Sequence, residues 1–333
     1  MRGSSMDRVI IENVAFPGGL HCETTTLGAL LRHEGLERSE PMLFGLGEGL
    51  GFVYWDAKNM DFPFLGGRVK PMALTRTAAD RLGLTLHVQE TTSPRKAWQN
   101  VTTALAEGRP VGLQLDCYHL EYFGTKVHFG GHFVAMRGYD DTHAHLIDTA
   151  QQGGAVTTTL ESLARARGER GPMTARNLSF TISGAVEVDL RDAVRKAIAG
   201  NARAFLNPPI ANLGHRGIGK AARQVTKWLD RSREPAHDLP LAATLMERGG
   251  TGGSLFRALY RDFLAEAAEI TGDDDIRLGH RLYAEIAPLW TEVADLVTAA
   301  GKTGDPAHLA RASQILIGLE AAERHATQVL ADV

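Results

Sequence analysis

The sequence predicts an α+β domain followed by an all-helical domain. At 333 residues the chain is longer than one hydrophobic core usually supports, so two domains are expected. Up to about residue 185, glycine-rich loops separate short β-branched runs, whereas long stretches rich in alanine and leucine follow with a helical period. We therefore predict a first domain over residues 6–185, after an opening segment typical of an expression vector, and a second over residues 186–333.

In the first domain, one helix and a later hairpin stand out. An apolar stripe that begins near Cys22 and stops at Gly35 predicts a helix between them. Three strands and a turn are predicted further along the chain, over residues 111–118, 132–137, 143–147 and, for the turn between the last two strands, 138–141. A helix followed far downstream by an antiparallel hairpin indicates an α+β arrangement.

In the second domain, apolar residues recur at the spacing of amphipathic helices. Two long series carry this period: Leu255, Phe256, Leu259, Tyr260, Phe263 and Leu264, then Ile286, Leu289, Trp290, Val293, Leu296 and Val297. A shorter helix is predicted to begin after Asp189, which can cap it, and to stop at Gly200. This part of the chain is therefore expected to be all-helical.

Composition and charge narrow the classes of function. With 44% hydrophobic and 23% charged residues, the chain has the composition of a folded globular protein. A formal net charge of -3 provides no overall basic field for a phosphate backbone, so nucleic acid is not expected as a partner. No apolar run reaches the roughly 20 residues that span a bilayer and no signal-like segment is found, so we expect no membrane association and a cytoplasmic location.

Cys22, His132 and Asp148 are the candidate catalytic residues. A cysteine attacks as its thiolate, which a helix N-terminus favours, and Cys22 lies in the first turn of its predicted helix. A histidine is needed to take the thiol proton, and a third group to orient the imidazole. His132 begins one predicted strand and Asp148 ends the next, so a hairpin brings them side by side. The spacing therefore predicts a Cys-His-Asp triad.

A structural interpretation of the same residues stays open, with Cys22 a buried free cysteine, His132 a core histidine and Asp148 the cap of a turn.

The other cysteine, Cys117, is predicted to be a packed thiol inside an apolar strand, and two cysteines are too few for a disulfide framework. His128 and His132 are four residues apart, but the two glycines between them argue against a helix. No metal site is expected.

A glycine-rich stretch runs Gly45-Leu46-Gly47-Glu48-Gly49-Leu50-Gly51. It fails the dinucleotide-binding fingerprint because Leu50 stands where the third glycine is required. We predict instead a loop beneath the active site, with Glu48 among the substrate-binding candidates. The alternative is a tight turn between two elements.

Two sets of motifs together cover nearly the whole chain. The first is His21-Cys22-Glu23-Thr24-Thr25-Thr26-Leu27, residues 39–52, Gly131-His132-Phe133-Val134, the turn 138–141 and Asp148. The second is Asn207-Pro208-Pro209 and residues 250–257 with Tyr260, Phe263 and Leu264. The first set resembles the butirosin biosynthesis protein H family, and the second is similar to the helical domain that commonly follows it.

The resemblance implies a papain-like fold related to the C39 peptidases, in an enzyme of antibiotic biosynthesis that moves an acyl group from a carrier-protein thioester to an amine. Cys22 would be the nucleophile, His132 the base and Asp148 the orienting acid. One position departs from papain-like enzymes, because Phe16 stands six residues before Cys22, where a glutamine usually supplies an oxyanion donor. The oxyanion donors are therefore expected to include the backbone N–H of Cys22, with the second donor unidentified.

Three further residues, Asp116, Tyr118 and Tyr122, match a family segment just before the histidine. The resemblance makes them candidates for the acceptor pocket, and a structural role is the alternative.

We therefore expect an acyltransferase that forms an amide, or closes a nitrogen ring when the amine belongs to the acyl chain itself. Its expected partners are an acyl carrier protein and a small-molecule amine; phosphopantetheine arrives on the carrier protein, so no cofactor of its own is expected. A cysteine peptidase is one alternative, against which the lack of a secretion signal counts. A non-catalytic binding module that keeps the papain-like shell is another, against which the presence of all three triad residues counts. A homodimer is left open.

Overall fold

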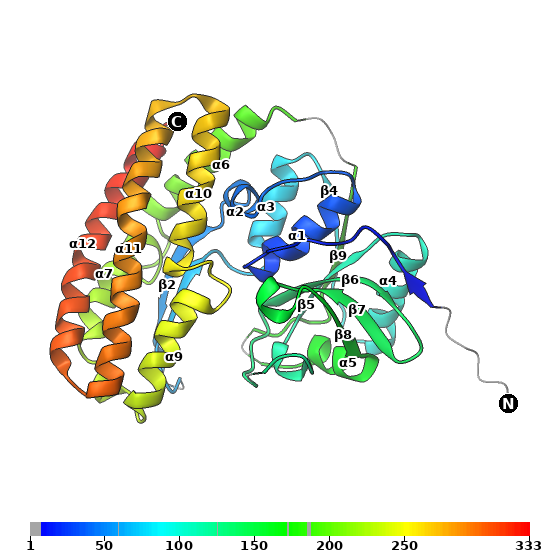
Figure 1. The fold of residues 1–333 in the computed structure, drawn as a ribbon, viewed down its shortest axis with the longest axis horizontal. Coiled ribbons are helices and arrows are strands. Elements are labelled where there is room, and N and C mark those ends of the chain that lie inside the picture. Colours follow the sequence, from blue (N-terminus) through cyan, green and yellow to red (C-terminus); the bar gives the residue numbers. More distant parts are fainter. Residues whose placement is uncertain (1–7, 59, 125, 172, 185–187) are drawn as a thin grey trace. The chain divides into compact units, whose positions relative to one another are not determined.

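The structure is a computed structural model that describes residues 8–58, 60–124, 126–171, 173–184 and 188–333 (Figure 1). The opening segment, the predicted domain start at residue 6 and the predicted boundary at residues 185 and 186 lie outside these residues. The chain forms two compact units. Unit 1 holds the described residues of Met1–Leu43 and of Thr75–Val188, and unit 2 holds those of Phe44–Leu74 and Asp189–Val333. Residues 44–74, placed in the first domain by the sequence analysis, thus group with the helical unit.

The main sheet of unit 1 has the strand order β4-β9-β5-β6-β7-β8, with β1 paired to β6 and every described pair antiparallel. Its strands are β1 (Val9–Ile10), β4 (Thr85–Gln89), β5 (Val111–Leu115), β6 (His132–Tyr139), β7 (His143–Ile147), β8 (Ala155–Thr159) and β9 (Ser179–Ser183). Successive side chains of a strand point to opposite faces. Ala135 of β6 accordingly packs with Val14 and Ala29 on one face, whereas its neighbours Val134 and Met136 belong to the core on the other face.

Helices cover both faces of this sheet. They are α1 (Cys22–His33), α4 (Pro94–Ala106) and α5 (Leu160–Gly168), while α2 (Glu40–Leu46) and α3 (Ala73–Arg81) lie where the chain passes between the two units. Helix α1 packs along β6 through Ala29, and α4 and α5 supply Val101, Leu105 and Leu163 to the opposite core. The nucleophile candidate therefore lies at the start of a helix that rests on the strand bearing the histidine.

Strand β5 is shorter than predicted. It ends at Leu115, because the side chain of Asp116 accepts a hydrogen bond from the backbone N–H of Tyr118 at 2.9 Å and caps the 3₁₀ turn η1 (Cys117–His119). The prediction of Cys117 and Tyr118 inside a strand was wrong for this reason. The strand β6, in contrast, extends two residues beyond its predicted end at 137.

Unit 2 is helical apart from a hairpin of β2 (Leu50–Trp55) and β3 (Phe64–Arg68). Its other elements are α6 (Leu190–Leu206), α7 (Gly214–Val225), α8 (Trp228–Arg231), α9 (Pro235–Arg248), η3 (Ser254–Phe256), α10 (Arg257–Thr271), α11 (Asp274–Thr303) and α12 (Pro306–Leu330). The long helix α11 packs against α9, α10 and α12, and α12 also packs against α6 and α7. Among the described residues, no helix is both long and apolar enough to span a bilayer. The predicted class, an α+β domain with an all-helical region, is confirmed.

Two helix ends in unit 2 differ from the prediction. Helix α6 does not stop at Gly200, which lies within it at a point where a Cβ atom would come within 2.5 Å of the Oε1 atom of Glu48. The glycine therefore makes room for this carboxylate instead of ending the helix. Helix α10 begins at Arg257, later than predicted, because Leu255 and Phe256 have φ angles of 50° and 74°, in the left-handed region.

Candidate active site

The chain that leads into α1 is held by a buried carboxylate. Glu40 accepts hydrogen bonds from the backbone N–H groups of Leu20 at 2.9 Å and His21 at 2.8 Å, and from the Thr24 hydroxyl at 2.8 Å. Burial raises the pKa of the Glu40 carboxyl, although these donors act in the opposite direction. Because Leu20 and His21 directly precede Cys22, Glu40 sets the backbone approach to the candidate nucleophile.

The candidate base and the candidate orienting acid are in contact. Nε2 of His132 lies 2.8 Å from Oδ2 of Asp148, and both side chains are buried. His132 is the first residue of β6 and Asp148 directly follows β7, so the pairing of these two strands brings them together. Asp148 also accepts a bond from the backbone N–H of Thr149 at 2.6 Å and one from the Tyr122 hydroxyl at 2.8 Å. These contacts fix the orientation of the carboxylate, and through it that of the imidazole.

Cys22 reaches the same imidazole. Burial by itself would lower the pKa of His132, but the Asp148 carboxylate and Cys22, to which the ring is hydrogen-bonded, hold it well above its ordinary value. Because Nε2 faces Asp148, Nδ1 is the ring nitrogen left for the sulfur of Cys22. The structure therefore brings all three predicted catalytic residues together within unit 1, with the candidate base in contact with both the candidate nucleophile and the candidate orienting acid.

Phe16 occupies the position where papain-like enzymes usually carry a glutamine that donates to the oxyanion. The Phe16 ring packs on α1 over Gly28, where a Cβ atom would come within 2.3 Å of the ring. This side chain offers no hydrogen-bond donor. The backbone N–H of Cys22 is the first of α1, and the first N–H groups of a helix have no acceptor within the helix. It is thus one donor that could face an oxyanion formed at the sulfur.

The four predicted substrate-binding residues fall in three places. Tyr122 donates to Asp148 and so belongs to the triad's surroundings. Asp116 and Tyr118 lie together at η1, where the Tyr118 ring stacks on His128 with centroids 4.0 Å apart. Glu48 belongs to unit 2, beside Gly200 of α6. A substrate role for these residues stays a prediction, with Tyr122 and Asp116 already engaged in structural hydrogen bonds.

The second cysteine is close to the site but differs in its surroundings. Cys117 lies in η1, with its sulfur 3.5 Å from the carbonyl oxygen of Val127. Burial raises the pKa of the Cys117 thiol, against the smaller opposite effect of a charge on His132. Its uncharged thiol form is thereby favoured, which suits a packing role.

Sequence reasoning assigned no role to several residues that support the site. Glu23, next to the cysteine, is fully buried and accepts bonds from the backbone N–H and hydroxyl of Thr75 at 3.1 and 2.9 Å. The Phe123 ring meets the His132 ring edge to face, with centroids 5.1 Å apart. Glu40 lies inside a motif already noted for its resemblance. The sequence did offer one signal for these residues. Glu23 and Glu40 lie near a helix start rich in apolar residues and threonine, and acidic side chains are rarely buried there unless they have a partner.

These features define the class of protein. A cysteine at the start of a helix that packs on an antiparallel sheet, with a hydrogen-bonded histidine and aspartate from neighbouring strands, is the arrangement of a papain-like cysteine enzyme. The chain belongs to the butirosin biosynthesis protein H family. Residues 21–149 match the family model described as butirosin biosynthesis protein H, N-terminal, and residues 161–330 match that described as domain of unknown function (DUF4872). The predicted family is confirmed.

Among solved structures, a crystal structure described as a "putative C39-like peptidase" from Bacillus anthracis is similar to part of the chain. It is 16% identical, with a TM-score of 0.38, over 55% of this chain and 100% of its own. No curated protein matches the chain.

Proposed function

We propose that this protein is an acyltransferase of natural-product biosynthesis, in which Cys22 takes an acyl group from a carrier-protein thioester and passes it to an amine. The observation that carries the proposal is the hydrogen-bonded set of Cys22, His132 and Asp148 in a chain of the butirosin biosynthesis protein H family. A nucleophile, a base that contacts it and a group that orients the base are the parts that covalent acyl transfer requires.

In the first step, the Cys22 thiolate attacks the carbonyl carbon of the carrier-protein thioester. The tetrahedral intermediate places its negative charge on the oxygen, near the backbone N–H of Cys22. When the intermediate collapses, the phosphopantetheine sulfur leaves and takes the proton of the His132 imidazolium. The products are the acyl-enzyme, the free carrier-protein thiol and a neutral His132, which Asp148 keeps in position.

In the second step, the amine attacks the carbonyl carbon of the Cys22 thioester. Neutral His132 takes the proton that the amine nitrogen loses, and the Cys22 thiolate is expelled as the amide forms. The imidazolium and thiolate are thereby restored. If the amine belongs to the acyl chain itself, the same two steps close a nitrogen ring.

The burial of the site supports transfer over hydrolysis. Cys22 and His132 are 8% and 7% exposed, and Asp148 is fully buried. Water competes with the amine for the acyl-enzyme, so an enzyme that makes an amide gains from limiting its access to the thioester.

The experiment that tests the proposal is incubation of the protein with carrier proteins that bear different acyl thioesters, followed by intact-mass measurement. A mass increase equal to the acyl group is expected, absent in Cys22→Ala and retained in Cys117→Ala. Addition of an amine panel should then release an amide, identified by mass.

The other function classes give distinct results in this experiment. A cysteine peptidase would cleave peptides and release the acyl group from the enzyme mainly as free acid. A binding module would hold the carrier protein without any covalent adduct. Failure of every acyl thioester to label Cys22, in a protein whose Cys22 still reacts with iodoacetamide, would contradict the proposed transferase.

A further inference from the structure

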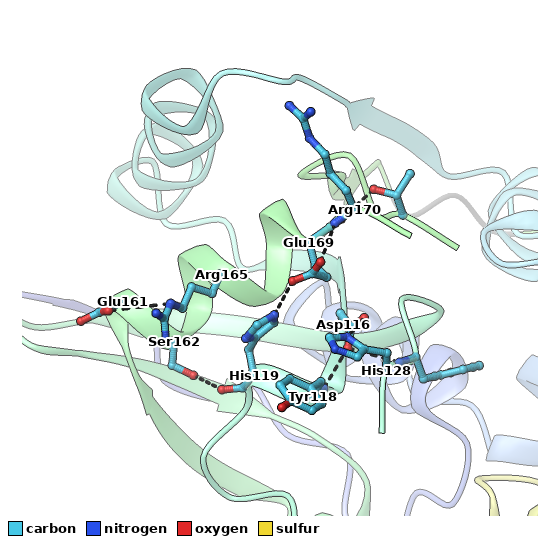
Figure 2. Close-up of polar contacts among 11 residues, drawn as sticks. Asp116, Tyr118, His119, His128, Glu161, Ser162, Arg165, Glu169 and Arg170 are labelled. Carbon is cyan, nitrogen blue, oxygen red and sulfur yellow. Dashed lines mark hydrogen bonds and ion pairs between the residues drawn. The ribbon is translucent and has the colours of Figure 1, made fainter. Parts of the chain in front are cut away.

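Three side chains with metal-binding atoms converge within unit 1. His119 ends the turn η1, His128 lies in the segment before β6, and Glu169 follows α5 as its C-terminal cap. One nitrogen of each histidine and one carboxylate oxygen of Glu169 all lie within 4.8 Å of one another. Figure 2 shows Glu169 and both histidines gathered from these separate segments. None of the three takes part in the catalytic contacts described above.

The carboxylate of Glu169 is already oriented toward the histidines. Its Oε2 atom lies 2.5 Å from Nε2 of His119, and its Oε1 atom accepts the backbone N–H of Arg170 at 3.0 Å. The hydrogen bond with His119, more than any other contact, lowers the pKa of the Glu169 carboxyl. The backbone carbonyl of His119 in turn accepts the Ser162 hydroxyl of α5 at 2.5 Å, which ties η1 to the same helix.

His128 is held by the arrangement that metal-binding histidines commonly have. Its Nδ1 atom lies 3.2 Å from Oδ2 of buried Asp116, and its ring stacks on Tyr118 with a 10° angle between the ring planes. The other oxygen of Asp116 accepts the backbone N–H groups of Tyr118 at 2.9 Å and Phe129 at 3.2 Å. A carboxylate bonded to one imidazole nitrogen fixes the tautomer and leaves the other nitrogen, here Nε2, to bind metal.

We propose that His119, His128 and Glu169 form a zinc-binding site. Two imidazole nitrogens and one carboxylate oxygen are a common set of three protein ligands for this ion, with water as the fourth. The side chain of His128 is 58% exposed and that of Glu169 31%, so a fourth position is open to solvent. Calcium and magnesium prefer all-oxygen sets, which this cluster does not supply.

The distances suit an ion after small side-chain movements. Ligand atoms about 2.0–2.1 Å from a tetrahedral zinc ion are about 3.3 Å from one another. When the ion binds, the proton between Nε2 of His119 and Glu169 is released to solvent. This pair, now 2.5 Å apart, then opens, and the remaining separations, at most 4.8 Å, close. Rotation of the exposed His128 side chain and the partly exposed Glu169 side chain would supply both changes.

The position of the site gives the ion a structural role. His119 and His128 bracket a segment that carries Tyr122, the donor to Asp148, and Phe123, which packs on His132. An ion bound to both histidines and to Glu169 would tie this segment to the end of α5. It would thereby hold Tyr122 and Phe123 against the triad without touching the substrate.

The test is equilibrium dialysis of the chelator-treated full chain against zinc, with elemental analysis. Cys22→Ala is used as the background, because Cys22, His132 and Asp148 are themselves a set of metal-binding side chains. One zinc ion per chain is expected in this background, and none after a further His119→Gln or His128→Asn change. His145→Gln is the matched control, since His145 forms a comparable partly exposed pair with Asp140 at 3.0 Å; it should retain one ion. Asp116→Asn should weaken binding by about 10- to 100-fold.

Cobalt gives a second measurement that does not depend on activity. Cobalt bound by two histidines and a carboxylate should show the visible bands of a tetrahedral ion without a sulfur-to-metal charge-transfer band. Such a band in the Cys22→Ala background would mean that the other thiol, Cys117, binds the ion, and would overturn the proposal. No zinc in the Cys22→Ala protein, or one ion retained in both histidine variants, would overturn it equally. His128→Asn alters an exposed side chain, and circular dichroism checks that the variant is folded.

Discussion

The Tyr122 hydroxyl and Nε2 of His132 both form hydrogen bonds with the same oxygen of Asp148, Oδ2, each across 2.8 Å. Burial and the neighbouring carboxylate raise the pKa of Tyr122 well above its usual range, so its hydroxyl keeps its proton and acts as a donor. The carboxylate that orients the imidazole is therefore itself oriented by a tyrosine 26 residues earlier in the chain. This contact turns a pair into a buried network, in which the loss of one member leaves the others unsatisfied.

Tyr122→Phe removes this donor while keeping the ring. We expect the free energy of unfolding to fall by about 1.5–3 kcal/mol, the usual value of a hydrogen bond to a charged group. Urea denaturation measures the change, with Tyr118→Phe, a partly exposed tyrosine, expected to alter stability by less than about 0.5 kcal/mol. Equal stabilities for the two variants would mean that the Asp148 contact contributes nothing.

Asp148→Asn should lower the pKa of His132. The folded-state pKa is raised because the carboxylate and Cys22 outweigh the effect of burial, and the substitution removes the carboxylate's charge. The contribution of the charged imidazole to stability is fully present below about pH 6.5 and is lost as the pH rises through the raised pKa. An NMR titration of the His132 ring should therefore show a midpoint above 6.5 in the original protein and a lower one in Asp148→Asn. An unchanged midpoint would contradict this account.

Glu40→Gln should slow acylation of Cys22. One amide oxygen cannot replace two carboxylate oxygens that accept from Leu20, His21 and Thr24, so the backbone before Cys22 loses part of its support. The rate of Cys22 alkylation by iodoacetamide and the urea unfolding curve report the change, with a loss of about 1–3 kcal/mol in stability expected.

Glu37→Gln provides the control for Glu40. Glu37 lies three residues earlier, just before α2, and its exposed side chain pairs with Arg32 across 3.4 Å, so its loss should be nearly neutral. If the two glutamate variants behave alike, Glu40 has no positioning role.

Local sequence patterns were enough to predict the helix that begins at Cys22 and the hairpin that joins His132 to Asp148. The helix has a periodic apolar face and a glycine at its end, where Gly35 takes a φ angle of 80°. The turn of the hairpin contains Asp140, whose side chain accepts hydrogen bonds from the backbone N–H groups of Thr142 and His143. Because each signal lies within a few residues of the feature it predicts, neither required knowledge of the rest of the fold.

The grouping of residues 44–74 with the helical unit could not be read from such patterns. Phe44 stacks on Phe256 with ring centroids 5.5 Å apart, and Gly67 lies so close to Leu255 that a Cβ atom would come within 2.2 Å of its carbonyl oxygen. These contacts join residues 212 and 188 positions apart in the sequence, and composition near residue 185 does not encode them. The hydrogen bonds of Glu40 to Leu20 and of Tyr122 to Asp148 were not predicted for the same reason, since the partners are distant in the sequence.

Glu323→Gln should destabilise unit 2 strongly. Glu323 and Arg257 are fully buried and form two hydrogen bonds of 2.9 Å, and Trp290 donates to the same carboxylate at 2.6 Å. The substitution leaves the charge of Arg257 without its counter-ion in the core. Breaking one partner of a buried pair costs about 3–5 kcal/mol.

Glu320→Gln is the matched control, on the same helix and one turn earlier. Glu320 is partly exposed and bonds to His215 at 3.0 Å, so its loss should cost less than about 1 kcal/mol. Urea unfolding followed by tryptophan fluorescence should separate the two variants. Trp290 reports on this site because the Arg257 guanidinium lies over its indole ring, 4.8 Å from the ring centroid. If Glu323→Gln is as stable as Glu320→Gln, the Arg257 charge must be satisfied by its backbone contacts alone, such as the 2.8 Å bond to the carbonyl of Leu255.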